Sequence, residues 1–190
     1  MNRYVKTGLV PALLLVSATS GFAGVEETVA LTDVPASVME AAKANLVGLR
    51  VVSDAPVPLE DESLMDDNLS VTYEALGDVK ITGANTETED DGSVVYEIQG
   101  TVDSGRRIEI DIDPDANVVE IEIEFFEKDV PGAVLKSVGA KMPDFVPEFI
   151  EASHSDSLQV IGYEFAGKIG DSPMDIEVSA DGRDITVADD

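Results

Sequence analysis

Oxygen-bearing side chains stand at alternate positions in one short segment: Asp111, Asp113, Asp115 and Asn117, followed by Glu122. This is the spacing of the ligand positions in the calcium loop of an EF-hand, where carboxylate and amide oxygens surround the ion. Weak calcium binding by these five residues is therefore the first chemical hypothesis that the chain suggests.

The local sequence favours a β-hairpin over an EF-hand at the same place. Ala116 stands where the calcium loop needs glycine for its sharp turn, and Pro114 stiffens the segment. Both flanks alternate apolar and acidic residues with the period of a strand, whereas an EF-hand requires helices. In a hairpin Asp111 and Glu122 would lie along strand faces and would not converge, so we expect low-specificity cation binding at most.

The hairpin interpretation places acidic side chains opposite one another. If its two strands pair, one sheet face carries Glu109, Asp111, Asp113, Glu120, Glu122 and Glu124. Like charges opposite each other on a sheet are unfavourable by up to about 1 kcal/mol per pair. A bound cation or a basic partner would relieve the repulsion, and so would water and salt, which is the simpler expectation.

The residue types give little support to a catalytic function. His154 is the single histidine and cysteine is absent, which excludes Cys–His chemistry and a His-rich metal site. A Ser–His–Asp set would have to use His154, but no Gly-x-Ser-x-Gly motif and no glycine-rich phosphate loop accompanies it. A carboxylate pair for glycoside hydrolysis stays open among 39 acidic residues, although the absence of tryptophan argues against a sugar cleft. We expect a protein that is not an enzyme and has no cofactor.

The charge balance narrows the classes of partner. The chain has 39 acidic and 12 basic residues, a formal net charge of −27. Such a protein repels nucleic acid and anionic lipid, so neither is an expected partner. It attracts cations and basic protein patches, and it also suits a saline environment, where a Debye length of about 8 Å or less screens self-repulsion.

The N-terminus has the pattern of a secretory signal peptide over residues 1–23. Arg3 and Lys6 precede an apolar stretch from Gly8 to Ala18, and a small-residue cleavage site ends at Ala23. The apolar stretch is shorter than the roughly 18 residues of a membrane span, which disfavours an uncleaved anchor. We expect a periplasmic or secreted protein with no membrane contact after cleavage.

Three short patterns occur twice, in the same order. Asp33-Val34-Pro35 recurs as Asp129-Val130-Pro131, Ala84-Asn85 corresponds to Ala152-Ser153, and Tyr96-Glu97-Ile98-Gln99-Gly100 recurs as Tyr163-Glu164-Phe165-Ala166-Gly167. Ordered matches of this kind indicate an internal duplication.

The elements that would position these residues can be read from periodicity. Each copy is expected to open with a helix, from about Pro35 to Val47 and again from Pro131 until Pro143 ends it. Period-two segments then predict strands over 79–83, 94–101, 108–112 and 119–125, and over 146–153, 158–169, 175–179 and 184–188. Residues 51–78 contain no lysine or arginine and have no counterpart in the second copy, which predicts an acidic insertion loop.

The paired motifs resemble a PepSY-like repeat of the kind grouped with β-lactamase-inhibitor-like (BLIP-like) secreted proteins. The first copy carries the resemblance in Val34-Pro35, Tyr96-Glu97-Ile98, Ile108-Glu109-Ile110 and Asp113-Pro114-Asp115. The second carries it in Val130-Pro131, Tyr163-Glu164-Phe165, Asp175-Ile176-Glu177-Val178 and Asp181-Gly182. The resemblance implies an α-plus-antiparallel-β unit used in pairs, with a role in binding or inhibiting another exported protein. The 51–78 insertion and Ala116 depart from the pattern, and no contact residue follows from it.

These observations predict an α+β fold of two tandem repeats. Each repeat would be a helix packed on an antiparallel meander of three to four strands, with the two sheets separate or joined edge to edge. The expected boundaries are 1–23 for the signal peptide, 24–32 for an acidic leader, 33–127 for the first repeat and 128–190 for the second. The expected function is a non-enzymatic binding or inhibitory module for an exported protein with a basic patch. The competing hypothesis is an acidic, calcium-binding envelope protein.

Overall fold

The computed structural model describes residues 25–53, 72–88 and 92–188. Its helices are α1 (Ala36–Asn45), the short 3-10 helix η1 (Glu127–Asp129) and α2 (Gly132–Lys141). The strands are β1 (Val25–Thr28), β2 (Arg50–Ser53), β3 (Thr72–Ala75), β4 (Lys80–Thr88), β5 (Val94–Thr101), β6 (Arg107–Ile112), β7 (Val118–Glu124), β8 (Phe145–His154), β9 (Val160–Ile169), β10 (Ser172–Ser179) and β11 (Ile185–Val187).

A single antiparallel sheet of nine strands dominates the molecule, in the order β1-β4-β5-β6-β7-β8-β9-β10-β11. This overturns the expected α+β fold of two helix-on-meander repeats, since the described chain has only two short α-helices and a 3-10 turn beside one large sheet. The decisive pairing is β7 with β8, which aligns Ile121 with His154 and Glu124 with Glu151. An unpaired strand edge leaves backbone N–H and C=O groups without partners, and this pairing satisfies them at the centre of the sheet.

Strands β4 to β11 fall on the predicted segments. Two of them are longer than predicted, because β4 continues to Thr88 and β10 begins at Ser172. The helices also begin where proline fixes the backbone, with Pro35 before α1 and Pro131 before α2. The boundary between 33–127 and 128–190 stays a prediction. The predicted signal peptide of 1–23 lies outside the described residues, whereas the acidic leader of 24–32 contains β1, which pairs with β4.

The core fills the space between the helices and one face of the sheet. Its sheet side includes the fully buried side chains of Ile98, Ile110, Ile112, Ile121, Ile123, Phe165 and Ile176. Its helix side includes Val38 and Ala42 from α1 and Val134 and Val138 from α2. Each fully buried side chain of this size contributes about 1.5–3 kcal/mol, so this layer is the main source of stability.

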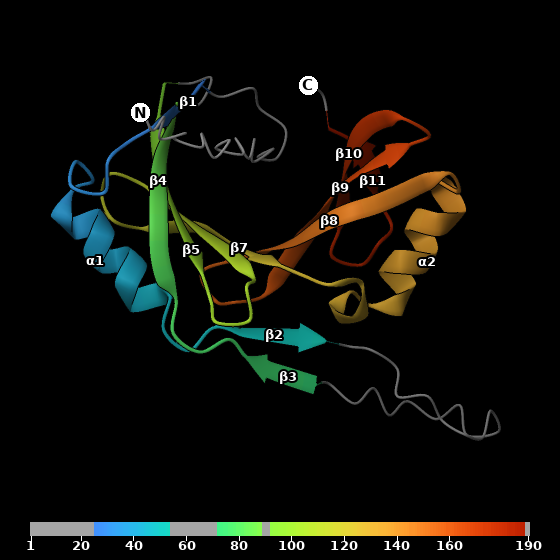
Figure 1. Ribbon diagram of the computed structural model, residues 1–190, viewed down its shortest axis with the longest axis horizontal. Coiled ribbons are helices and arrows are strands. Elements are labelled where there is room, and N and C mark those ends of the chain that lie inside the picture. The colour runs from blue at the N-terminus through green and yellow to red at the C-terminus, as the bar shows by residue number, and fades with distance from the viewer. Residues whose placement is uncertain (1–24, 54–71, 89–91, 189–190) are drawn as a thin grey trace, which may run out of the picture.

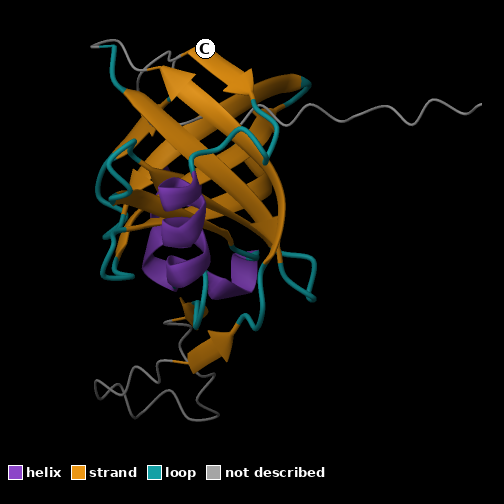
Figure 2. Ribbon diagram, turned by 90° about the vertical axis from the view of Figure 1, so that its left-hand side faces the viewer, coloured by secondary structure: helices purple, strands orange, loops and turns teal. Residues whose placement is uncertain are grey.

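The sheet is strongly bent. In Figure 1, β4 and β5 rise on one side of β7 while β9 and β10 rise on the other, and both helices lie outside this bend. In Figure 2, turned by 90°, the helices overlap in projection, because α1 and α2 lie on opposite sides of the bend in Figure 1. The helix-covered apolar face is therefore the outer face of the bend, and the opposite face of the sheet is the inner one.

The ends of the predicted 51–78 insertion form a separate two-stranded ribbon, β2 with β3. Val51 and Leu76 are buried in the core at the base of this ribbon, while 54–71 lies outside the described residues. The ribbon lies on the same side of the sheet as the helices (Figures 1 and 2).

Arg106, just before β6, ties the ribbon to the sheet. Its side chain is fully buried and lies 2.9 Å from Asp129 Oδ2 and 3.1 Å from Glu74 Oε2 of β3. It also donates to the Glu124 carbonyl at 3.0 Å and stacks over the Phe126 ring at 4.0 Å. A buried arginine with two carboxylate partners fixes β3, η1 and the β6–β7 pair relative to one another.

Candidate functional site: the acidic face of the sheet

Alternation along the strands places carboxylates on the inner face of the bend. We call this surface the acidic face and define it by Glu26, Glu87, Glu97, Glu109, Asp111, Glu120, Glu122, Glu124, Glu151, Glu164, Asp175 and Glu177. Both helices of the described chain lie on the other side of the sheet. Successive side chains of a strand point to opposite faces, so the residues between these carboxylates are the isoleucines and aromatics of the core.

Strand register lines these carboxylates up in rows across the sheet. One row runs Glu97, Asp111, Glu120 over β5, β6 and β7. A second runs Glu124, Glu151, Glu164, Glu177 over β7 to β10. Because β7 pairs with β8, the second row is continuous across the centre of the sheet. Directly opposed carboxylates repel one another, so each row needs protons or cations to offset the charge.

Several of these carboxylates are buried with only part of their hydrogen-bonding capacity satisfied. Glu97 is 1% exposed, Glu109 6% and Asp111 8%. Each has one oxygen that accepts no hydrogen bond from the described residues. Gln99 Nε2 donates to the other oxygen of Glu109 at 2.9 Å. Water and salt were the expected relief for this face, but burial removes these carboxylates from water, where a charge without a partner is costly.

Burial therefore changes the proton affinity of these groups. It raises the pKa of Glu97 to about 8, with the nearby Glu109 carboxylate as the second cause. Burial also raises the pKa of Asp111 well above its usual value, and Glu109 and Glu97 raise it further. The pKa of Glu122 is raised in the same way, first by burial and then by Glu151. A carboxyl group with a pKa of about 8 holds its proton at neutral pH.

The second half of the face behaves similarly. Burial, with Glu151 and Asp175 nearby, raises the pKa of Glu164 to about 8. The pKa of Glu151 rises to about 7, because burial and Glu109 outweigh the guanidinium of Arg107. Arg107 Nε lies 3.6 Å from Glu124 Oε2. This guanidinium acts on both Glu124 and Glu151, and no ion pair with Glu164 or Glu177 is formed by the described residues.

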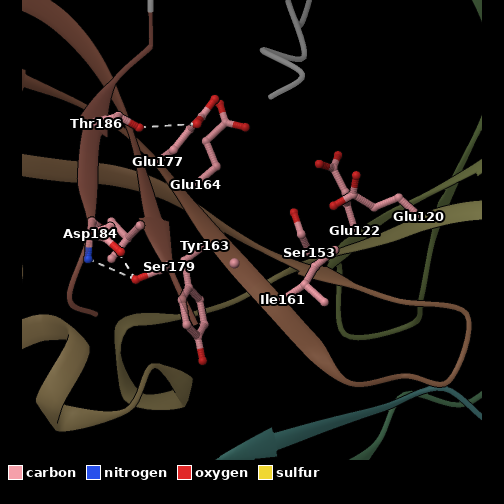
Figure 3. A pocket seen from close by; sticks show the side chains of 12 residues that line it. Glu120, Glu122, Ser153, Ile161, Tyr163, Glu164, Glu177, Ser179, Asp184 and Thr186 are labelled. Atoms are coloured by element: carbon pink, nitrogen blue, oxygen red, sulfur yellow. Dashed lines mark hydrogen bonds between the residues drawn. The ribbon is translucent and has the colours of Figure 1, made fainter. Parts of the chain in front are cut away.

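A cavity of about 360 Å³ opens in the acidic face between β7 and β11. Figure 3 shows Glu120 and Glu122 on one side of it and Glu164 and Glu177 on the other. Its remaining lining is Ser153, Ile161, Gly162, Tyr163, Val178, Ser179, Asp184 and Thr186. The cavity combines carboxylates and hydroxyls with the aliphatic residues Ile161 and Val178, which is a lining suited to a cationic group.

The five residues predicted to bind calcium are not brought together as one site. Asp111 faces Glu120 across the hairpin and Glu122 faces Glu109, so these two lie diagonally on the acidic face. Among the residues that the structure describes, no three His, Cys, Asp or Glu side chains are arranged to hold a metal ion.

The other three of these residues form the turn between β6 and β7. The Asp113 carboxylate accepts hydrogen bonds from the backbone N–H and from Nδ2 of Asn117, both at 2.8 Å. These bonds lower the pKa of Asp113. Asp115 is exposed, and Ala116 adopts the positive φ of 68° that glycine would favour. The predicted hairpin is confirmed, and its turn uses Asp113 and Asn117 to close itself.

His154 lies on the apolar side of the sheet. It is buried, with Nδ1 3.2 Å from the Ile121 carbonyl oxygen and its ring 5.9 Å from that of Phe125. Burial lowers the pKa of its imidazole below the usual value of 6.5. His154 is therefore separated from the carboxylates of the acidic face.

Sequence reasoning identified the acidic side of the β6–β7 hairpin but missed the buried rows that cross the sheet. The repeated Tyr-Glu motif was a signal for them, since Glu97 and Glu164 both belong to this face. Only the pairing of β7 with β8 reveals that the carboxylates of both halves share one surface.

No family model matches the chain, and neither does any curated protein or solved structure. The resemblance to PepSY-like and BLIP-like proteins therefore stays an expectation. Within the described part of the chain, no helix has the length and apolar character needed to cross a membrane.

Proposed function

We propose that the protein is an exported, non-enzymatic binding module that contacts a basic patch of another exported protein through its acidic face. The observation that carries the proposal is the rows of opposed carboxylates that strand register lines up across β5 to β10. Within them, one oxygen each of Glu97, Glu109 and Asp111 lacks a hydrogen-bond partner among the described residues. Lysine or arginine side chains of a partner would neutralise the face and supply charge-assisted hydrogen bonds.

The extent of the face favours a protein partner over a single ion. Neighbouring strands lie about 4.8 Å apart, so the row from Glu124 to Glu177 covers roughly 14 Å, and further carboxylates extend it to β1. A surface of this width matches a patch of several basic side chains. Complementary charges of this kind mainly speed encounter and select the partner, and they weaken as salt rises.

Capture from the extracellular and periplasmic fractions, with two charge variants, tests the proposal. The face variant combines Glu120→Gln, Glu164→Gln and Glu177→Gln. The control variant combines Glu40→Gln, Asp78→Asn and Glu127→Gln, three exposed carboxylates away from the acidic face. We expect the original protein and the control to retain the same basic partner, and the face variant to lose it. Elution of the partner should begin as salt is raised.

Two outcomes would contradict the binding-module proposal. One is a partner that the face variant retains as well as the control does. The other is retention that does not change between low and high salt. A partner identified by mass spectrometry would then be purified and measured pairwise, so that capture alone is not the final readout.

Calcium binding is the second candidate function, and the unpartnered oxygens of Glu97, Glu109 and Asp111 are the observation in its favour. Against it, the described residues contain no metal-holding group of three. Calorimetry with CaCl2 at constant ionic strength separates the two functions. A tight, stoichiometric site with a matching rise in melting temperature would favour the calcium-binding envelope protein.

A further inference from the structure

The cavity of about 360 Å³ has a floor of small residues. Register places Ser153 beside Glu122, Gly162 beside Ser153 and Ser179 beside Gly162, across β7 to β10. Small side chains in adjacent strands leave open space where longer ones would fill the face. The resulting volume lies within the range of about 300–1,000 Å³ that is usual for small-molecule sites.

Glu122 is a buried acid that lines this cavity without a donor. Its side chain is 6% exposed, and none of the described residues donates a hydrogen bond to its carboxylate or forms an ion pair with it. Figure 3 shows it on the same side of the cavity as Glu120 and across from Glu164 and Glu177. Buried carboxylates normally pair with a hydrogen-bond donor or a cation, and the Glu122 carboxylate has neither among the described residues.

Ile161 gives the cavity an aliphatic wall. It is 53% exposed and lies at a register shift, where Ser153 pairs with Gly162 but His154 pairs with Val160. The shift leaves Ile161 unopposed on β9 and places it among the lining residues. An apolar side chain beside carboxylates suits the methylene groups of an organic ligand and offers nothing to a metal ion.

We propose that this cavity is a binding site for an organic cation, with an ammonium or guanidinium group on a short aliphatic chain. Glu122 and Glu120 would hold the charged group from one side, and Glu164 and Glu177 from the other. The aliphatic chain would lie against Ile161. The cation is either a free amine or an arginine or lysine side chain of a protein, and in the latter case the inference rests on the proposed binding function.

Calorimetry on the purified protein tests the site with two probes at constant ionic strength. Agmatine represents a free cation with a guanidinium group, and Nα-acetyl-arginine amide represents an arginine side chain of a partner. We expect saturable binding of at least one probe with a stoichiometry of about one, as for a single pocket. Replacing NaCl by probe at the same ionic strength separates binding from screening.

Two variants test the location of the site in different ways. Glu122→Gln removes the carboxylate that would pair with the cation and should weaken binding at least about tenfold, as expected for the loss of a charge-assisted hydrogen bond of roughly 1.4 kcal/mol or more. Ser153→Leu fills the floor of the cavity without changing charge and should abolish binding. Glu40→Gln on α1 removes one carboxylate elsewhere and should leave affinity within about twofold. Circular dichroism confirms that each variant is folded.

The outcomes distinguish a free organic cation from a side chain of a protein partner. They also distinguish the cavity proposal from the binding-module proposal. Binding of both probes indicates recognition of the guanidinium chain itself, whereas binding of Nα-acetyl-arginine amide alone indicates a side chain of a partner. No saturable binding of either probe would overturn the inference, and so would equal affinity in Glu122→Gln, Ser153→Leu and the original protein. Capture of a protein partner is a separate readout, so either proposal can fail without the other.

Discussion

Two adjacent arginines have opposite environments, although the sequence presents them as a pair. Arg106 is fully buried between Asp129 and Glu74, while Arg107 is half-buried on the acidic face and stacks at 4.0 Å over Phe149. Asp129 Oδ2 also accepts a hydrogen bond from the Phe126 N–H at 2.8 Å. Loss of Arg106 would leave the Asp129 charge buried and without its strongest partner.

Replacing Arg106 by methionine should lower the free energy of unfolding by about 3–5 kcal/mol, because removing one member of a buried pair leaves the other uncompensated. Arg183→Met is the matched control, since Arg183 is an exposed arginine that pairs with Asp181 at 3.3 Å. It should leave the free energy unchanged within error. Urea unfolding measures both, and equal effects of the two variants would show that Arg106 has no structural role.

At the scale of the elements, the two glycines that end the repeated Tyr-Glu motif both lie close to the backbone of a neighbouring strand. A Cβ atom on Gly167 would lie 2.4 Å from the Val146 carbonyl oxygen, and one on Gly100 would lie 3.2 Å from the Lys80 carbonyl oxygen. In each case the neighbouring strand has a register shift close by, at Pro147/Phe149 or at Ile81/Gly83. The motif therefore ends in glycine because a bulged strand approaches its backbone.

Gly167→Ala should lower the free energy of unfolding by about 1–3 kcal/mol, the usual cost of forcing a methyl group into packed structure. Gly139→Ala is the control variant, for which we expect stability to change in the opposite direction. Gly139 lies inside α2 with open space around its Cα, so alanine should raise stability by up to about 1 kcal/mol. Thermal unfolding of both variants measures these changes. Unchanged stability of Gly167→Ala would contradict the close approach of the Val146 backbone to Gly167.

At the scale of the whole molecule, the acidic face links stability to pH. The pKa of Glu97 and of Glu164 is about 8 and that of Glu151 about 7 in the folded protein, all above the usual value of 4.5. The folded state therefore holds more protons than the unfolded chain between about pH 4.5 and 8. Stability from these groups is full below pH 4.5 and is lost as pH rises towards 8.

We expect the free energy of unfolding to fall as pH rises from 5 to 9. Glu97→Gln should make this slope shallower by up to about 1.4 kcal/mol per pH unit, the value for one proton held by the folded state alone. Glu40→Gln removes the same formal charge from exposed surface and should leave the slope unchanged. His154, whose pKa is lowered by burial, contributes the opposite sign below about pH 6.5. Urea unfolding across the range provides the test, and a slope that Glu97→Gln does not alter would contradict it.

The sequence by itself determined the strands from β4 to β11, the hairpin turn at Asp113–Asn117 and the two helices that begin after Pro35 and Pro131. It did not predict β1, β2 or β3. It also determined which side chains alternate with the core isoleucines. These features depend on neighbouring residues, because a period of two, a turn signal and a fixed proline φ act over a few positions.

The tertiary structure alone decided that β7 pairs with β8, that β1 joins the edge of the sheet, and that the sheet bends with its carboxylates inside. Which distant strands pair depends on which strand edges meet in the folded chain. The alternation of side chains within one strand does not indicate its neighbour, because the same alternation is compatible with any neighbouring strand. The burial of Glu97 and the cavity beside Glu122 follow from that assembly, since one strand shows that a residue faces away from the core but not what surrounds it.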